Sequence, residues 1–235
     1  MFTKSAEFYD LIYASKDYAG ESAYIHELIQ RYKRTVGSRL LDAACGTGQH
    51  LRYLRRYYNA QGFDLDEEML AIAHDRLPDL LLYHADLASF SLGKQFDVIT
   101  CLFSAIGYVE TEARLQLATE AFRRHLVKGG ILIFEAWFSP EEYVPDTVHA
   151  RFVDEPDLKI ARMNVSRIEG TVSVLDFRYM VAVADGIFTF DETHRLGLFT
   201  DEQYRRAVER SGFKVVLRDP EGISGRSLYI CEVVD

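Results

Sequence analysis

Residues 40–51, which read L-L-D-A-A-C-G-T-G-Q-H-L, decide the fold. Two leucines run into an acid, small residues and two glycines follow, and an amphipathic helical pattern then begins. Glycine permits the sharp bend of such a strand-to-helix turn and lets a ligand lie against the backbone. The N-terminus of the helix offers unpaired N–H groups and partial positive charge to an anionic group. An ordinary strand–helix turn without a ligand remains the alternative for these letters alone.

The composition is that of a soluble globular protein, with 235 residues, 48% hydrophobic content and a net charge of −9. No apolar run approaches the roughly 20 residues that span a bilayer, and residues 1–10 lack a signal-peptide core. We therefore expect a cytoplasmic protein that does not enter a membrane. The acidic balance and the absence of a basic stretch argue against nucleic acid as a partner.

Strand and helix patterns alternate along the first half of the chain. Strands are expected at 39–43, 60–64, 80–84, 96–102 and 131–135, and helices near 48–57, 66–76 and 111–125, the last ended by Gly129-Gly130. This alternation predicts an α/β fold with a mainly parallel, Rossmann-like sheet and helices on both faces. A helix at 200–211 and strands at 213–218 and 227–234 complete the expected sheet.

The alternation stops between strand five and the last helix. Residues 160–167 and 172–184 alternate apolar and polar side chains, and Asp185-Gly186 is a strong hairpin signal. We therefore expect an inserted antiparallel sheet of three or four strands. The corresponding domains are 1–139 with 197–235 as the cofactor-binding part, and 140–196 as a substrate or lid subdomain.

Acids recur at the carboxyl ends of the first three expected strands, as Asp42, Asp64 and Asp86. In an open parallel sheet, ligands bind outside these ends. Asp64, about twenty residues beyond the glycine turn, fits the acid that accepts hydrogen bonds from two ribose hydroxyls. Asp86, with the Leu87 N–H, suits the amino edge of an adenine. Each acid alone also fits a solvated strand end, and Asp66 fits a helix cap.

A nicotinamide dinucleotide is the alternative ligand, because its fold has a similar pattern. Here Gln49 and His50 replace the end of the G-x-G-x-x-G turn, and no acid/base pair for hydride transfer stands out. Both observations favour adenosine without a pyrophosphate.

The motifs D-A-A-C-G-T-G, G-F-D-L-D, H-A-D-L and F-S-A-I-G-Y resemble those of class I S-adenosylmethionine-dependent methyltransferases. That resemblance covers about residues 5–137 and implies a seven-stranded sheet whose seventh strand, here 227–234, is antiparallel. It implies S-adenosylmethionine as methyl donor and S-adenosylhomocysteine as product.

A narrower resemblance extends over nearly the whole chain. Y-D-L-I-Y, K-D-Y, F-S-L-G, E-A-W-F-S-P-E and S-G-R-S-L-Y are similar to motifs of the dTDP-3-amino-sugar N,N-dimethyltransferases, which also carry an antiparallel insert. The likeness implies a cofactor pocket lined by Tyr9, Tyr18, Ala43, Gly46, Asp64, Leu65, Met69, Asp86, Leu87 and Ser104. It implies that Tyr108, Glu135, Trp137, Phe138 and Arg226 face the acceptor.

The sequence departs from this family pattern at three places. Met1 stands where the family has a tyrosine, E-A-W-F-S-P replaces E-P-W-W-F-P, and Asp64 replaces a glutamate. The cofactor assignment is unaffected by these changes, whereas the identity of the acceptor depends on them.

Methyl transfer needs an acceptor lone pair held in line with the donor, and an amine must be neutral to attack. Tyr108 and Glu135 follow strands that end at the cofactor, so they are the candidate catalytic residues. Packing for Tyr108 and a salt bridge for Glu135 are the alternatives. Trp137 and Phe138 suit either an aromatic surface on which a sugar or base stacks, or apolar packing at the hinge of the inserted sheet. Arg226 suits either a bidentate diphosphate contact or an exposed surface position.

Other sites and activities are weighed against this hypothesis. The three cysteines are unpaired by spacing, and the histidines, expected mostly at the surface or at helix caps, are not spaced as metal ligands, so no metal is expected. A small-molecule N-methyltransferase is favoured. O- or C-methylation of another metabolite and a non-catalytic S-adenosylmethionine-binding protein are the alternatives, and a homodimer is left open.

Overall fold

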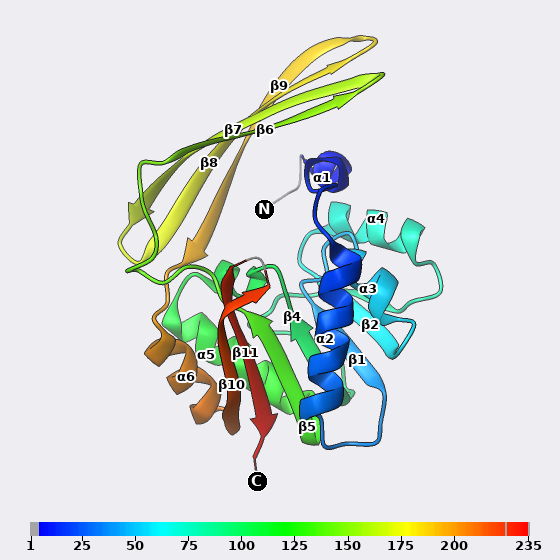
Figure 1. The fold of residues 1–235 in the computed structure, drawn as a ribbon, viewed down its shortest axis with the longest axis vertical. Helices are drawn as coiled ribbons and strands as arrows, with labels where there is room; N and C mark the ends of the chain where they lie inside the picture. Colours follow the sequence, from blue (N-terminus) through cyan, green and yellow to red (C-terminus); the bar gives the residue numbers. More distant parts are fainter. Residues whose placement is uncertain (1–4, 224, 235) are drawn as a thin grey trace.

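The computed structural model describes residues 5–223 and 225–234, which form two sheets and seven helices (Figure 1). The departure noted at Met1 and part of the S-G-R turn lie outside these residues. The helices are α1 Ala6–Ile12, α2 Tyr18–Tyr32, α3 Gln49–Leu54, α4 Glu67–Arg76, the 3-10 helix η1 Ala105–Val109, α5 Glu112–Arg124 and α6 Asp201–Arg210.

The larger sheet has seven strands in the order β10-β11-β5-β4-β1-β2-β3. All its pairs are parallel except β5–β11 and β10–β11, which are antiparallel, so the expected α/β fold and antiparallel last strand are confirmed. Its strands are β1 Arg39–Ala43, β2 Asn59–Asp64, β3 Leu82–His84, β4 Phe96–Cys101, β5 Leu126–Glu135, β10 Phe213–Ile223 and β11 Arg226–Val233.

Apolar clusters cover both faces of this sheet. On one face, α5 and α6 pack residues such as Phe122 and Tyr204 against the strands, and on the other α2 and α3 contribute Ile25 and Leu51. Side-chain caps set where several helices begin. Asp66 accepts from the N–H groups of Glu68 and Met69, as expected, so α4 starts directly after β2.

The smaller sheet is antiparallel, with order β6-β7-β8-β9, and it projects over the carboxyl ends of the parallel strands (Figure 1). Its strands are β6 Val148–Glu155, β7 Leu158–Glu169, β8 Val172–Val183 and β9 Gly186–Gly197. The expected antiparallel sheet and the Asp185-Gly186 hairpin are therefore present.

One expectation about local structure is wrong. Helix α5 ends at Arg124, where the His125 ring caps it by bonding the Ala121 carbonyl, so Gly129-Gly130 lie inside β5. Gly129 has φ +74°, and the β4–β5 register shifts nearby, which is how β5 accommodates the glycine pair. Tyr9 lies in helix α1, whose Phe8 and Ile12 pack on the second sheet.

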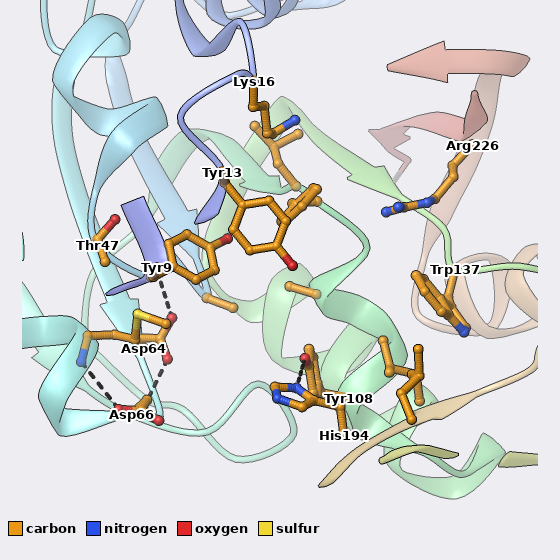
Figure 2. A pocket seen from close by; sticks show the side chains of 18 of the residues that line it. Tyr9, Tyr13, Lys16, Thr47, Asp64, Asp66, Tyr108, Trp137, His194 and Arg226 are labelled. Atoms are coloured by element: carbon orange, nitrogen blue, oxygen red, sulfur yellow. Dashed lines mark hydrogen bonds between the residues drawn. The ribbon is translucent and has the colours of Figure 1, made fainter. Parts of the chain in front are cut away.

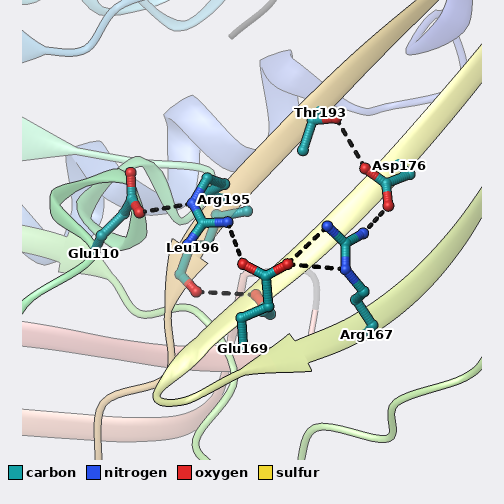
Figure 3. A network of polar contacts seen from close by, with 8 residues as sticks. Glu110, Arg167, Glu169, Asp176, Thr193, Arg195 and Leu196 are labelled. Atoms are coloured by element: carbon teal, nitrogen blue, oxygen red, sulfur yellow. Dashed lines mark hydrogen bonds and ion pairs between the residues drawn. The ribbon is translucent and has the colours of Figure 1, made fainter.

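An ion-pair network ties β9 to η1 (Figure 3). Arg195 bonds Glu110, which follows η1, at 3.0 Å, and Glu169 at the β7 end at 2.7 Å. Arg167 pairs with both Glu169 and Asp176. Single exposed ion pairs contribute little to stability, but charges that form a network contribute more. This network holds the second sheet against the loop that follows β4.

Candidate active site

A cavity of about 940 Å³ lies between the carboxyl ends of the parallel strands and the inner face of the second sheet. This volume is near the upper end of the roughly 300–1,000 Å³ that is usual for ligand pockets. The position is the switch point of the parallel sheet, where β1 pairs with β2 on one side and with β4 on the other. The cavity has room for more than one small molecule.

The glycine turn forms one end of the cavity. Gly46 (φ +55°) and Gly48 (φ +76°) both adopt the left-handed conformation. A Cβ at Gly46 would meet no atom within 4 Å, whereas at Gly48 it would come within 2.9 Å of Leu77 Cδ1. Gly48 is therefore needed for packing, and Gly46 leaves open backbone beside the cavity against which a ligand can lie.

Carboxylates surround this turn. Asp64 accepts from the Gly46 N–H at 2.7 Å and from the Asp66 N–H at 2.9 Å (Figure 2). Asp42 accepts from the Thr100 hydroxyl at 2.7 Å, and burial raises its pKa to about 6. Asp86 accepts from the Ala88 N–H at 2.7 Å and pairs with Arg114 at 2.8 Å. Each carboxylate is thus fixed in orientation by the protein itself.

Helix α1 and the residues after it close the cavity on one side (Figure 2). The Tyr9 and Tyr13 rings lie 4.7 Å apart, and Tyr13 meets Phe103 edge-on at 5.3 Å. Asp10 accepts from the Thr47 hydroxyl in the glycine turn at 2.8 Å and pairs with Arg76. The aromatic wall is therefore held directly to the glycine turn.

The opposite wall is made by Trp137 and Arg226 (Figure 2). The Trp137 Nε1–H donates to Ser173 Oγ at 2.8 Å, and the Arg226 guanidinium lies 4.9 Å from the Trp137 ring centroid. Arg226 also donates to Ser104 Oγ at 2.9 Å and lies 3.8 Å from Glu135. An indole beside a fixed cation offers a stacking surface and an anion contact together.

Most of the residues expected at the site line this cavity. They are Tyr9, Tyr18, Gly46, Asp64, Leu65, Met69, Asp86, Leu87, Tyr108, Trp137, Phe138 and Arg226.

Ala43, Ser104 and Glu135 are not on the cavity wall but lie behind it. Ala43 is fully buried in β1, and the Ser104 hydroxyl donates to the Ala136 carbonyl at 2.7 Å. Glu135, 1% exposed, accepts from the Phe103 N–H at 2.7 Å. Burial raises the pKa of Glu135, although the nearby Arg226 opposes the rise. In this structure Glu135 contacts Arg226 and the backbone rather than the cavity.

The loop after β4 carries backbone strain at this wall. Phe103 (φ +54°) and Ser104 (φ +59°) are consecutive non-glycine residues in the left-handed region. Such residues cost of order 1–3 kcal/mol each and persist where the surroundings hold them. Here Glu135 and Arg226 bond to these two residues and hold the loop that leads to Tyr108.

The inner face of the second sheet supplies residues that the sequence did not single out for the site. Arg151, Arg162, Asn164 and Phe177 line the cavity. The alternation in residues 160–167 did contain a signal, because Arg162, Asn164 and Ser166 recur at every second position of β7.

His194 also departs from expectation. His74 and His84 are exposed and His125 caps a helix, as expected, but His194 is 2% exposed. Its Nδ1 lies 2.7 Å from the Tyr108 hydroxyl (Figure 2). Burial lowers the pKa of His194 and raises that of Tyr108, so both are neutral near pH 7.

Residues 5–223 and 225–234 contain neither a candidate membrane-spanning helix nor a group of candidate metal ligands. No helix there is both long and apolar enough to cross a bilayer. Within the same residues, no three His, Cys, Asp or Glu side chains gather as metal ligands.

Comparison with known proteins agrees with this architecture. Residues 40–130 match a family model described as a methyltransferase domain. The chain is 41% identical over 228 residues to dTDP-3-amino-3,6-dideoxy-alpha-D-glucopyranose N,N-dimethyltransferase of Streptomyces fradiae, covering 95% of this chain and 89% of the relative.

Solved structures give the same family. Streptomyces venezuelae DesVI superposes with a TM-score of 0.91 at 34% identity, covering 97% of this chain and 98% of that one. CalS10, an amino pentose methyltransferase from Micromonospora echinaspora solved with S-adenosylmethionine bound, gives 0.83 at 34% identity, covering 92% and 91%. This chain belongs to the S-adenosylmethionine-dependent methyltransferases, in the same branch as these sugar N-methyltransferases.

Proposed function

We propose that this enzyme transfers methyl groups from S-adenosylmethionine to the amine of a nucleotide-linked amino sugar. The observation that carries the proposal is the division of charge within one cavity. Asp42, Asp64 and Asp86 gather at the glycine turn, where one cation, Arg114, pairs with Asp86. Arg151, Arg162 and Arg226 line the end formed by the second sheet and β11. A cationic donor suits the acidic end, and an anionic diphosphate suits the basic end.

The acidic end fits an adenosyl group. Gly46 leaves open backbone toward the cavity, and N–H groups anchor both oxygens of Asp64, a carboxylate with further acceptor positions. We assign the ribose hydroxyls to Asp64, the adenine to Asp86 and Leu87, and flanking contacts to Gly46, Leu65 and Met69. Tyr9 and Tyr18 cover the pocket, and Ala43 and Ser104 support its floor.

The basic end fits the acceptor. Trp137 and Phe138 provide a stacking surface, and Arg226 stands beside it with its guanidinium over the indole. The curated relative from Streptomyces fradiae is named for a dTDP-linked 3-amino sugar, and the same substrate class supports the assignment of diphosphate to the arginines. Residues 140–196 then act as the substrate-binding subdomain, and Glu135 acts by holding Arg226.

The main contribution of the protein to methyl transfer is to position the amine relative to the methyl donor. When bound, the sulfonium of S-adenosylmethionine supplies an already activated methyl group. The two walls hold the amine in line with it, and orientation of this kind can contribute roughly 7–11 kcal/mol. Tyr108, at the junction of the two ends, contacts the amine and orients its lone pair. We place this reaction in the cytoplasm, with a small molecule and not nucleic acid as the substrate. Light scattering tests whether the enzyme is a homodimer.

Mass spectrometry tests the proposal. The enzyme, S-adenosylmethionine and a dTDP-linked 3-amino-6-deoxyhexose should yield products heavier by one and two methyl groups on nitrogen. A matched sugar with a hydroxyl in place of the amine should stay unmodified. Methylation of that hydroxyl sugar alone would favour O-methylation, and cofactor binding without any product would favour a non-catalytic binding protein.

A further inference from the structure

His194 is the middle member of a chain of three polar side chains that begins at the cavity wall. Its Nδ1 lies 2.7 Å from Tyr108 Oη, and its Nε2 lies 3.6 Å from Glu192 Oε2. Glu192 accepts from the Ser5 N–H at 2.9 Å and the Ser5 hydroxyl at 2.7 Å. Only Tyr108 and His194 line the cavity, so the chain leads from the cavity into the protein.

The chemistry of the three groups fixes the direction of their protons. The negative charge of Glu192, 3.6 Å from Nε2, favours the neutral His194 tautomer that carries its proton on Nε2. Nδ1 is then an acceptor, and the Tyr108 hydroxyl donates to it. The phenol hydrogen is thus directed at His194, and the Tyr108 oxygen has lone pairs left for a donor inside the cavity.

We propose that Tyr108, His194 and Glu192 form a relay that removes a proton from the protonated amine of the acceptor. This inference rests on the proposed function, since it needs an amine acceptor. An N–H bond of the ammonium breaks as that hydrogen binds Tyr108 Oη, and the Tyr108 hydrogen moves to His194 Nδ1. The amine keeps the electron pair that attacks the methyl group. The imidazolium is stabilised by Glu192 and later releases its proton to water.

The surroundings of His194 suit a temporary positive charge. Glu192 from its own strand favours the imidazolium, whereas Arg162 from β7 disfavours it. Tyr108 from η1 bonds it, and Phe177 from β8 meets the ring edge-on at 5.1 Å. Because Glu192 and Arg162 act in opposite directions, the His194 ring can accept a proton and then release it. The Arg195 ion pair with Glu110 keeps β9 and η1 together, which keeps the Tyr108–His194 distance short (Figure 3).

In the relay Tyr108 is the catalytic residue, and His194 and Glu192 are positioning residues that act through it. His194→Gln and Glu192→Gln keep polar groups in place but remove the basic ring or the charge that stabilises it. We expect kcat near pH 7 to fall on the order of 10²-fold for His194→Gln, the lower end of the usual contribution of proton transfer. The KM for S-adenosylmethionine should not change.

The decisive readout is the pH profile with the dTDP-linked 3-amino sugar. At alkaline pH the free amine is already neutral, so the activity of His194→Gln and Glu192→Gln should approach that of the wild type. His74→Gln on the exposed face of α4 and Asp191→Asn on the outer face of β9 are the matched controls and should follow the wild-type profile. An equal loss at every pH, or no loss, would overturn the relay.

Melting temperature and S-adenosylhomocysteine binding identify a variant that fails to fold. In that event Tyr108→Phe is measured over the same pH range. It should lose activity at every pH, because the amine loses its contact, and lose more near pH 7 than at alkaline pH, because proton removal is lost as well. A wild-type enzyme that methylates no amine overturns the proposed function and the relay with it. A wild type that methylates the amine, beside variants impaired equally at every pH, overturns the relay alone.

Discussion

Asp64→Asn is the substitution that most sharply examines the cofactor end of the site. In the structure the two Asp64 oxygens accept from the Gly46 and Asp66 N–H groups, at 2.7 and 2.9 Å. A carboxylate has about four acceptor positions, so Asp64 can accept from ribose hydroxyls in addition to these N–H groups. An asparagine offers only one oxygen, and its NH2 group must face either a backbone N–H or a ribose hydroxyl.

The expected magnitude comes from the hydrogen bonds that are lost. Hydrogen bonds to charged groups contribute about 1.5–3 kcal/mol each, so losing one and weakening the other costs about 3 kcal/mol. This corresponds to a Kd for S-adenosylhomocysteine on the order of 10²-fold weaker. Isothermal titration calorimetry measures it, with Glu67→Gln, exposed in the first turn of α4, as the matched control.

A thermal melt of the same variant separates binding from folding, because Asp64 also holds the glycine turn. The account requires that affinity falls while the variant still melts cooperatively. An Asp64→Asn protein that binds S-adenosylhomocysteine as tightly as the wild type would refute the placement of the ribose.

Three further predictions concern the acceptor end and the buried charge. Arg226→Ala should raise the KM for the amino sugar at least about tenfold and leave cofactor affinity unchanged, as measured by steady-state kinetics and calorimetry; an equal loss of cofactor affinity would make Arg226 structural. Glu135→Gln keeps an acceptor for the Phe103 N–H, so its effect should be smaller and confined to the same KM, and a larger defect than that of Arg226→Ala would contradict its indirect role. Burial raises the pKa of Asp42 from 3.8 to about 6, so this group stabilises the fold at low pH and that contribution is lost as pH rises through 6. Asp42→Asn should therefore gain stability over the wild type between pH 4 and 7, by up to about 3 kcal/mol in urea unfolding, and a pH-independent difference would contradict the buried charge.

Local patterns in the sequence were sufficient to predict the parallel sheet and its cofactor end. Each of the signals used lies within a short stretch of the sequence. They are the glycines, the acids at strand ends and the apolar periodicity of α5. Gly46 and Asp64, eighteen residues apart, come within hydrogen-bond distance because β1 pairs in parallel with β2. Such contacts follow once the order of the strands is known.

The acceptor end could not be predicted in the same way. Tyr108 and His194 are separated by 86 residues, and their contact depends on how the second sheet is oriented over the first. Strand alternation indicates which face of β9 carries His194 but not what that face covers. Similarly, Glu135 sits at the end of a strand that leads to the site, yet the left-handed turn at Phe103 places its carboxylate behind the wall.

A crystal structure with S-adenosylhomocysteine and the dTDP-linked amino sugar tests the central claim most directly. We predict the ribose hydroxyls on Asp64, the diphosphate on Arg226, and the amine beside the Tyr108 hydroxyl, facing the sulfur. A structure in which the nucleoside lies away from the glycine turn, or in which the amine lies far from both the sulfur and Tyr108, would contradict the account.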